Sequence, residues 1–244
     1  MQPSEQLLEL FRRIPLFAGL ETSALAEVIA EGFRKTVQQG TFLFWQDEPA
    51  RYMYVLLQGR VRLVKTTPEG QRVVIRYITP GEMFGVIAVL GQVTYPVTAE
   101  VAESGEVIGW SGDTMHALME CYPRIALNAM HQMAGRLREL LRRVQELSTE
   151  RVERRIAHVL LRLTRQCGRK VEDGIQIDFS ITREEIAQLA GTTLFTVSRT
   201  ISKWEKQGIL QTSREHMLIR QPHALVVIAE DLPPHPEENR EDGE

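Results

Sequence analysis

The stretch GTTLFTVSRTISKWEKQGIL, residues 191–210, predicts a helix with one buried and one exposed face. Its apolar residues Val197, Ile201 and Trp204 recur every three or four positions, as the buried face of a helix requires. The other face would present a ring, two hydroxyls and a guanidinium to solvent: Phe195, Ser198, Arg199 and Ser202. A surface helix without a function is the plain alternative, but an exposed phenylalanine lowers solubility. We therefore interpret this face as a binding surface.

A second, shorter helix is predicted immediately before this stretch. Thr182 can cap its first turn, and Glu185 three residues later completes a capping box. Gly191 would end that helix, and Thr193 would cap the next one almost at once. Two helices that cross closely around a short turn form a helix-turn-helix, whose second helix fits a DNA major groove about 12 Å wide.

The exposed face then has a role in reading base edges. Arg199 can donate two parallel hydrogen bonds to guanine, a contact worth about 1–3 kcal/mol of discrimination. Ser198 can serve a base edge or a phosphate, and Phe195 offers an apolar surface to a thymine methyl group. The candidate contacts to the DNA backbone are Thr182, Thr192, Thr193, Thr196, Ser202, Lys203 and Lys206. Residues 208–220, GILQTSREHMLIR, predict a two-stranded wing, with Arg214 or His216 near the DNA backbone.

The amino-terminal half carries the pattern of an antiparallel β-roll. Between residues 36 and 110, short segments rich in β-branched and aromatic residues alternate with turns that contain glycine. Many short strands without intervening helices predict a small antiparallel roll or barrel. The expected class is thus α+β, with the roll followed by a long helix and a winged helix-turn-helix.

The long helix is predicted to start near Pro123 and to carry a heptad repeat. The apolar residues that form this dimer seam are Met130, Met133, Leu137, Leu140, Val144 and Leu147. The stripe is narrow, which favours pairing with a second copy, although a helix packed on its own domain is the alternative. We expect a sensor domain over 1–122, a dimerisation helix over 123–148, a DNA-binding domain over 149–232 and a disordered acidic tail over 233–244.

Composition excludes several classes of protein. The chain has 43% hydrophobic and 25% charged residues, and no apolar run approaches the roughly 18 residues of a membrane span. The start, MQPSEQLLELFRR, lacks the features of a secretory signal, so we expect a cytoplasmic protein without a membrane partner. Two distant cysteines cannot form a four-cysteine iron–sulfur or zinc site. Because no catalytic or metal-binding motif is present either, we do not expect an enzyme or a bound metal.

The order of these parts resembles the Crp/Fnr superfamily over residues 7–228. The carrying motifs are IPLFAGLETSALAEV, LLQGRVRLV and PGEMFG in the first half, and TREEIAQLAGTTLFTVSR in the second. The resemblance implies a homodimeric transcription regulator that binds a DNA palindrome and contacts RNA polymerase, and whose roll senses a signal. A cyclic-nucleotide-binding module that acts on a protein partner is the alternative function, and the helix-turn-helix opposes it.

Two departures from the family pattern bear on specificity and on the effector. Phe195 stands where the family commonly has a glutamate that reads bases, and Val86 stands where cyclic-nucleotide members have another glutamate. Because residues 77–123 contain no lysine or arginine, a cyclic phosphate would meet no opposite charge there, and we do not expect cyclic AMP.

The motif YPVTAEV is similar to the branch of the family that responds to nitrogen oxides, some members of which hold haem. Under this hypothesis the axial ligand would be His131, facing the roll from the long helix, or His116. Cys121 as a redox switch is a further alternative, but nothing basic beside it in the sequence would lower the pKa of its thiol.

Overall fold

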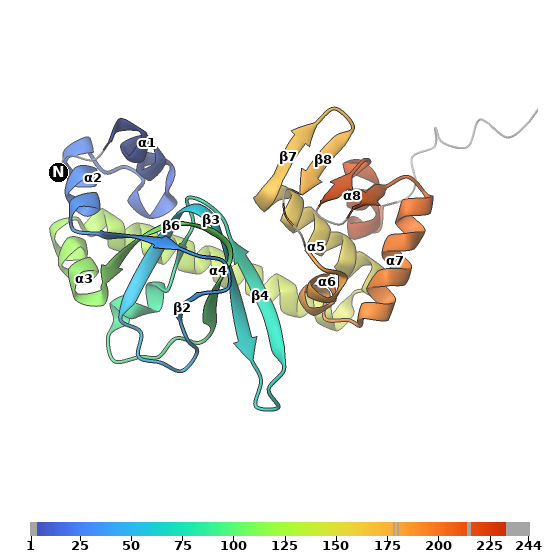
Figure 1. Cartoon of the computed structure of the whole chain (residues 1–244), viewed down its shortest axis with the longest axis horizontal. Coiled ribbons are helices and arrows are strands. Elements are labelled where there is room, and N and C mark those ends of the chain that lie inside the picture. Colours follow the sequence, from blue (N-terminus) through green and yellow to red (C-terminus); the bar gives the residue numbers. More distant parts are fainter. Residues whose placement is uncertain (1–3, 178, 180, 214–215, 233–244) are drawn as a thin grey trace, which may run out of the picture. The chain divides into compact units, whose positions relative to one another are not determined.

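A computed structural model describes residues 4–177, 179, 181–213 and 216–232 of the chain. The chain separates into two compact units, Met1–Leu141 and Arg142–Glu244, which we describe one at a time (Figure 1). The first is built on an antiparallel β-roll and the second on a winged helix-turn-helix, so the expected α+β class is confirmed. The predicted tail over 233–244 and Arg214 of the wing lie outside the described residues.

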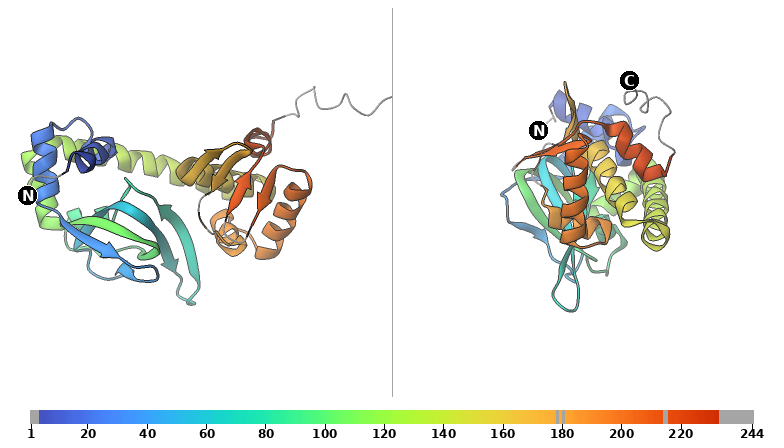
Figure 2. Two further views of the ribbon diagram at one scale, coloured as in Figure 1. Left: turned by 45° about the horizontal axis from the view of Figure 1, so that its top comes forward. Right: turned by 90° about the vertical axis from the view of Figure 1, so that its right-hand side faces the viewer.

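The roll is a six-stranded sheet in the order β1-β6-β3-β4, in which β2 also pairs with β6 and β5 with β3. All of these pairs are antiparallel. The strands are β1 (Phe33–Val37), β2 (Phe42–Phe44), β3 (Tyr52–Thr66), β4 (Arg72–Ile78), β5 (Met83–Phe84) and β6 (Thr98–Ser111). The long strands β3 and β6 are strongly curved (Figure 2).

Register shifts between β3 and β6 allow this curvature. They fall around residues 56–61, where the backbones approach closely. A side chain at Gly105 would put its Cβ 1.9 Å from the Gln58 carbonyl oxygen, so only glycine fits at that position.

Short helices cover one end of the roll, namely α1 (Glu5–Arg13), η1 (Pro15–Phe17), α2 (Thr22–Ala30) and α3 (Gly112–Cys121). Their core packs on Trp110, which meets Phe11 and Phe17 at ring centroid distances of 6.1 and 6.0 Å. The buried indole Nε1 of Trp110 donates a hydrogen bond of 2.7 Å to the Val28 carbonyl oxygen, so the ring carries no unsatisfied donor. A second cluster fills the roll itself, around Phe44, Phe84 and neighbouring aliphatic residues.

Helix α4 (Pro123–Thr149) is the long helix that the heptad pattern predicts. Proline suits its first position because that residue needs no intrahelical donor. The helix passes along one side of the roll (Figure 2), and Ile125 and Ala129 are buried in the cluster around Trp110. Asn128 Nδ2 donates to the carbonyl oxygens of Leu16 and Ala18, at 2.9 Å each. These contacts fix the start of α4 against the first unit.

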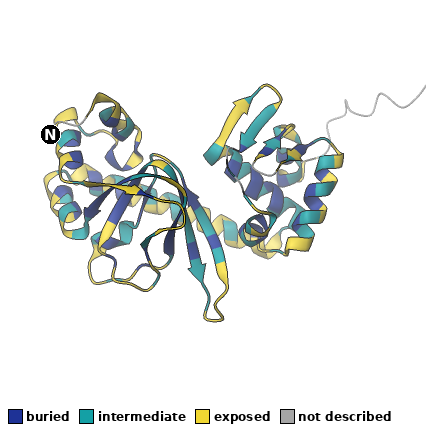
Figure 3. Ribbon diagram, in the orientation of Figure 1, coloured by how far each residue is buried: buried dark blue, intermediate teal, exposed yellow. Residues whose placement is uncertain are grey.

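The second unit begins at Arg142, within α4, and its next helix is α5 (Val152–Cys167), which follows α4 after only residues 150 and 151. The helix-turn-helix is α6 (Arg183–Ala190) and α7 (Leu194–Lys206), and α8 (Pro222–Glu230) closes the unit. The buried residues of this unit gather on the facing sides of α5, α6 and α7 (dark blue in Figure 3), with Trp204 fully buried. Because one face of α7 is buried in the core of this unit, the orientation of its opposite, exposed face is fixed.

A four-stranded antiparallel sheet, in the order β7-β8-β10-β9, flanks these helices. The predicted wing is the pair β9 (Leu210–Thr212) and β10 (Met217–Ile219). The hairpin of β7 (Gly168–Val171) and β8 (Gly174–Ile177) was absent from our sequence interpretation. A signal was available, because the dipeptide Asp173-Gly174 is typical of a hairpin turn, although the two residues that connect the strands are Glu172 and Asp173.

Candidate nucleic-acid interface and sensor cavity

The turn between α6 and α7 sets the crossing of the two helices. Thr182 and Glu185 form the predicted capping box, with the Glu185 amide donating to Thr182 Oγ1 at 3.1 Å. Gly191 ends α6 in the left-handed conformation, with φ of 60°, which glycine adopts without strain. Thr193 then caps α7 by accepting a hydrogen bond of 3.2 Å from the Thr196 amide.

The outward face of α7 carries the residues that the sequence assigns to base reading. Phe195 is 75% exposed, Arg199 is exposed and Ser198 is half-buried. Leu194, 49% exposed, lies beside Phe195 at the start of the helix and was missed. Its signal was the same apolar character on the exposed face. The first turn of α7 thus offers the apolar side chains of Leu194 and Phe195, and the next turn offers the guanidinium of Arg199.

The residues predicted to contact the DNA backbone differ in their exposure and in the hydrogen bonds that their polar groups already make. Lys206 and Thr193 are exposed, whereas Thr192, Thr196 and Ser202 are half-buried. The hydroxyls of Thr182 and Thr193 already accept hydrogen bonds as helix caps. Lys203 Nζ is held at 2.8 Å from Glu153 Oε1 on α5. This ion pair partly neutralises one of the two lysines that a DNA phosphate would meet.

Ser213 and His216, the described residues at the end of the wing, are hydrogen-bonded to each other. The Ser213 amide donates to the His216 carbonyl oxygen at 2.9 Å, and the His216 amide donates to Ser213 Oγ at 3.1 Å. The His216 side chain is exposed.

The predicted dimer seam is an exposed apolar stripe along α4. All six of its residues are exposed, from 47% for Leu147 to 66% for Met130. Three more apolar residues extend the stripe on one side, each three residues before a seam position: Leu127, Ala134 and Leu141. They share one heptad position and were missed because the interpretation considered only the two main positions of the repeat. A stripe of this width would face water in a single copy, which favours a second helix on it.

Two cavities lie between the roll and α4 within the first unit. The first, of about 200 Å³, has mostly apolar walls from strands β2, β3 and β5, from the segment between β5 and β6, and from α4: Phe44, Leu63, Phe84, Gly85, Val86, Ile87, Tyr95, Pro96, Val97 and Met133. The second, of about 230 Å³, is more polar and is lined by Ile14, Pro15, Arg76, Gly81, Glu82, Gly135 and Glu139. Met83, Gln132 and Arg136 line both cavities.

Arg136 brings a positive charge to this place that the sequence interpretation did not foresee. Residues 77–123 contain no cation, but the charge comes from α4 instead. Arg136 Nη2 donates to the Met83 carbonyl oxygen at 3.3 Å. Desolvation by burial and then the nearby charge of Arg76 lower the pKa of Arg136 below its ordinary value. The expectation that an anion would find no opposite charge is therefore wrong for the cavity as a whole.

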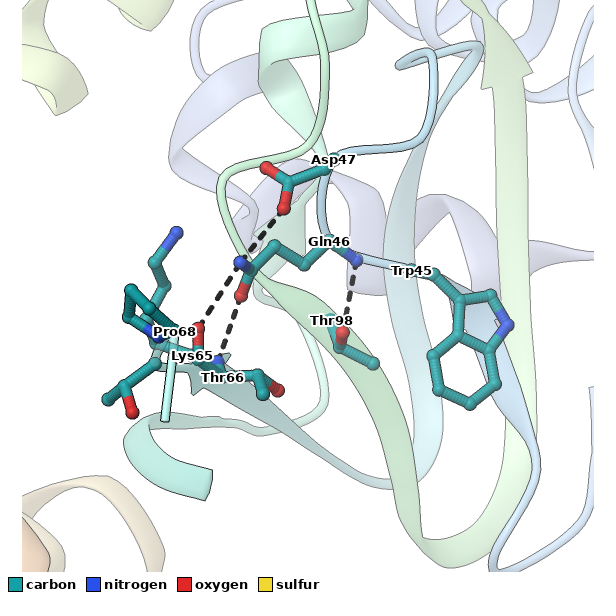
Figure 4. A pocket seen from close by; sticks show the side chains of 8 residues that line it. Trp45, Gln46, Asp47, Lys65, Thr66, Pro68 and Thr98 are labelled. Atoms are coloured by element: carbon teal, nitrogen blue, oxygen red, sulfur yellow. Dashed lines mark hydrogen bonds between the residues drawn. The ribbon is translucent and has the colours of Figure 1, made fainter. Parts of the chain in front are cut away.

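A wider, open hollow of about 540 Å³ lies elsewhere on the roll, between the segment after β2 and the β3–β4 turn (Figure 4). Gln46 connects the two sides of this hollow, since its side chain accepts a hydrogen bond from the Thr66 amide and donates one to the Thr66 carbonyl oxygen. The Gln46 amide donates to Thr98 Oγ1 at 3.0 Å. Trp45 stands at the edge of this hollow and stacks on Phe42 with a centroid distance of 3.9 Å.

The two histidines considered for haem do not fit such a site. His131 is exposed and lines neither cavity beside α4, whereas its neighbour Gln132 lines both, so the prediction that His131 faces the roll is wrong. One helical step rotates a side chain by about 100°, which turns His131 away from the roll. His116 is exposed on α3 and lies 3.5 Å from Glu120. Within the described ranges, no three His, Cys, Asp or Glu side chains converge as a metal site would require.

No helix among the described residues is long and apolar enough to cross a membrane.

Residues 34–122 match the family of the cyclic nucleotide-binding domain, and residues 154–228 match the Crp-like helix-turn-helix domain. The cyclic AMP receptor protein of Thermus thermophilus is 30% identical over 215 residues, which cover 88% of this chain and 96% of that protein. The chain belongs to the Crp/Fnr superfamily of transcription regulators.

Solved structures agree with this membership. The catabolite activator protein of Thermus thermophilus is 30% identical, with a TM-score of 0.52, over 90% of this chain and 100% of that one. FixK2 from Bradyrhizobium japonicum shares the fold with a TM-score of 0.70 at 24% identity, over 81% of this chain and 96% of that one. Crp/Fnr regulators bind DNA through the helix-turn-helix and work as dimers, and the relatives are regulators rather than enzymes.

Proposed function

We propose that this Crp/Fnr regulator is a cytoplasmic homodimer that binds a palindromic DNA site and contacts RNA polymerase. Each protomer would lay α7 in the major groove, with Arg199 reading a guanine and with Phe195 and Leu194 against a thymine methyl group. The division into a sensor over 1–122, a dimerisation helix over 123–148 and a DNA-binding domain over 149–232 belongs to the same proposal.

One observation carries the DNA-reading role. The buried face of α7, with Val197, Ile201 and Trp204, fixes the helix rigidly in its own unit, so the opposite face is presented in one orientation. That face holds a 75% exposed phenylalanine next to an exposed arginine. Leu194, 49% exposed, adjoins this phenylalanine, and a contiguous exposed apolar patch is typical of an interaction surface.

The exposed stripe on α4 supports the dimer. Pairing two such stripes in parallel would place the two α7 helices symmetrically about one axis. A two-fold symmetric protein reads a site whose half-sites lie one DNA turn apart, about 34–36 Å.

The sensor would respond to something other than cyclic AMP. Relatives include a cyclic AMP receptor protein, but Val86 and Pro96 on the wall of the apolar cavity offer no side-chain hydrogen bond to a ribose, and Gln132 and Arg136 supply donors only where this cavity meets the polar one. A nucleotide there would leave polar groups unpaired, which costs free energy. Because neither candidate histidine fits a haem site, we propose no haem and no nitric oxide response through it.

The test is selection of bound duplexes from a random pool. We expect wild-type protein to enrich a palindrome with a G·C pair at one fixed step of each half-site, with or without added cyclic AMP. Arg199→Ala should lose the preference at that step, at a cost of about 1–3 kcal/mol per half-site, and retain it elsewhere.

Arg165→Ala is the matched control, because Arg165 is exposed on α5 and carries the same charge outside the reading face. It should keep the wild-type preference at every step. A pool without enrichment, or an Arg199→Ala protein as selective as wild type at every step, contradicts the proposal.

A further inference from the structure

The two cavities beside α4 are continuous in their lining, because Met83, Gln132 and Arg136 border both. Their volumes, about 200 and 230 Å³, together reach the lower end of the range of about 300–1,000 Å³ that small-ligand sites occupy. One cavity is apolar and the other is polar, so the lining changes character where these three side chains meet. A ligand that spans the junction would need an apolar part and a polar part.

The polar groups at the junction are hydrogen-bond donors without adequate acceptors. Gln132 Nε2 is buried and has no hydrogen-bond partner among the described residues. Arg136 has five N–H donors and no acceptor, and its bond to the Met83 carbonyl oxygen, at 3.3 Å, is long. Leaving a buried donor unpaired costs about 1–3 kcal/mol, so an acceptor at this place would be stabilising.

The carboxylates nearby do not supply that acceptor. Glu82 is engaged by Arg76 and also accepts from the amide and hydroxyl of Thr79, at 2.8 and 2.9 Å. Glu139, which lines the polar cavity, is an exposed residue. The charge of Arg136 is therefore without a direct hydrogen-bonded counter-ion among the described residues, and a ligand carboxylate would give it one.

The part of a ligand that occupies the apolar cavity should carry no polar groups. Phe84, Val86, Ile87 and Val97 contribute only hydrocarbon side chains to its wall. The Tyr95 hydroxyl is occupied, because it donates to the Tyr52 carbonyl oxygen at 2.7 Å and accepts from the Tyr52 amide at 2.9 Å. A sugar or a nucleobase would find no hydrogen-bond partner among these side chains.

We propose that the effector is a small amphiphilic carboxylate, whose head binds Arg136 and Gln132 and whose apolar body fills the cavity beside Phe84 and Val86. This inference rests on the proposed function, since it names the ligand of the sensor. Met133 lines the apolar cavity and is also a residue of the exposed stripe. A ligand that moves Met133 changes the stripe directly, which connects binding to the dimer.

The experiment is titration calorimetry of the full chain, without DNA, with octanoate, octan-1-ol and octylamine. Each of these three probes has eight carbons in an unbranched chain, and their heads are an anion, a neutral hydroxyl and a cation respectively. We expect octanoate to bind at least tenfold more tightly than either of the others, because only its head is an anion that accepts charge-assisted hydrogen bonds from both donors. Equal binding of octanoate and octanol, or no heat with any of the three, overturns the inference.

Variants locate the binding. Arg136→Gln and Gln132→Leu should each reduce the octanoate-to-octanol preference at least fivefold, while Arg138→Gln, exposed on the same helix and outside both cavities, should leave it unchanged. Thermal unfolding and sedimentation of each variant check that it remains folded and dimeric. If Arg136→Gln does not fold, Gln132→Leu decides alone. An unchanged preference in the variants overturns the assignment, whatever the DNA selection gives, because DNA binding is measured separately.

Discussion

Lys203 illustrates how one residue's role depends on its neighbours. Glu153 Oε1 accepts from Lys203 Nζ at 2.8 Å and from the Trp204 indole at 3.2 Å. The lysine can reach a DNA phosphate only by leaving this carboxylate. An exposed ion pair is worth about 0.2–1 kcal/mol, so the pair lowers DNA affinity by a modest factor.

We therefore predict that Glu153→Gln tightens DNA binding about two- to fivefold at low salt. The glutamine oxygen can still accept from the Trp204 indole, so the packing of α7 should persist. Fluorescence anisotropy with a labelled duplex measures the effect, and adding Lys203→Ala to the variant should remove it. Equal affinities of wild type and Glu153→Gln would show that Lys203 does not contact DNA.

Glu100 is a buried carboxylate on β6, with 6% exposure, that pairs with Arg62 at 2.7 Å and with Arg72. Desolvation tends to raise its pKa, but hydrogen bonds and charges from the two arginines outweigh desolvation and lower the pKa below its ordinary value. The unfolded carboxyl has a pKa of about 4.3. The stabilisation is thus present above about pH 4.3 and is lost as the pH falls toward the lowered pKa.

We predict that Glu100→Gln costs about 1–3 kcal/mol of unfolding free energy at pH 7 and makes the loss of stability between pH 6 and pH 3.5 shallower. Urea unfolding at several pH values measures both effects. Glu106→Gln is the control, because Glu106 lies on the same strand and its ion pair with Arg34, at 2.7 Å, is exposed to solvent. Parallel pH curves for wild type and Glu100→Gln would contradict the assignment.

At the scale of the element, α4 divides its heptad between two tasks. The exposed stripe occupies three heptad positions, whereas two others carry residues that contact the chain itself. Arg136 binds the Met83 carbonyl oxygen in the first unit. In the second unit Arg143 Nη2 donates to the Leu189 carbonyl oxygen at 2.7 Å, and Arg162 binds Glu146 at 2.9 Å. The polar side of the helix fixes it to its own chain and leaves the apolar side for a partner.

We predict that Leu137→Glu, at the centre of the stripe, shifts the protein from dimer to monomer at micromolar concentration, because two charges would be buried opposite each other. Analytical ultracentrifugation measures the shift. Arg138→Glu, next in sequence but outside the stripe, should leave the dimer intact. A stable Leu137→Glu dimer would contradict the seam.

The elements were predictable from the sequence where a local signal specifies them. The capping box at Thr182 and the left-handed glycine at Gly191 define the helix-turn-helix without knowledge of the rest of the fold. The β7–β8 hairpin is short, and its turn signal was overlooked. Gln132 and Arg136 could not be identified, because their role depends on which side of α4 meets the roll. That contact is tertiary, and the same uncertainty of helix rotation put His131 on the wrong side.

At the scale of the whole molecule, a symmetric dimer fixes the spacing of the DNA half-sites. We predict that inserting five base pairs between the half-sites of the selected palindrome reduces affinity nearly to that of a single half-site. Five base pairs rotate one half-site by about half a turn, to the opposite side of the duplex. Gel-shift titration measures the loss, and a duplex with the same composition and the original spacing is the control. Unchanged affinity would mean that the two copies bind independently.

Leu147 belongs both to the stripe on α4 and to the surroundings of the turn before α7. A Cβ added to Gly191 would lie 2.5 Å from Leu147 Cδ2, so the leucine side chain reaches the point where the first helix of the motif ends. If a partner helix also covers Leu147 in the dimer, then dimerisation and DNA binding both depend on the position of this side chain. Thermodynamic linkage then requires reciprocity: the factor by which dimerisation raises the affinity for a DNA duplex equals the factor by which that duplex raises the affinity of the two copies for each other.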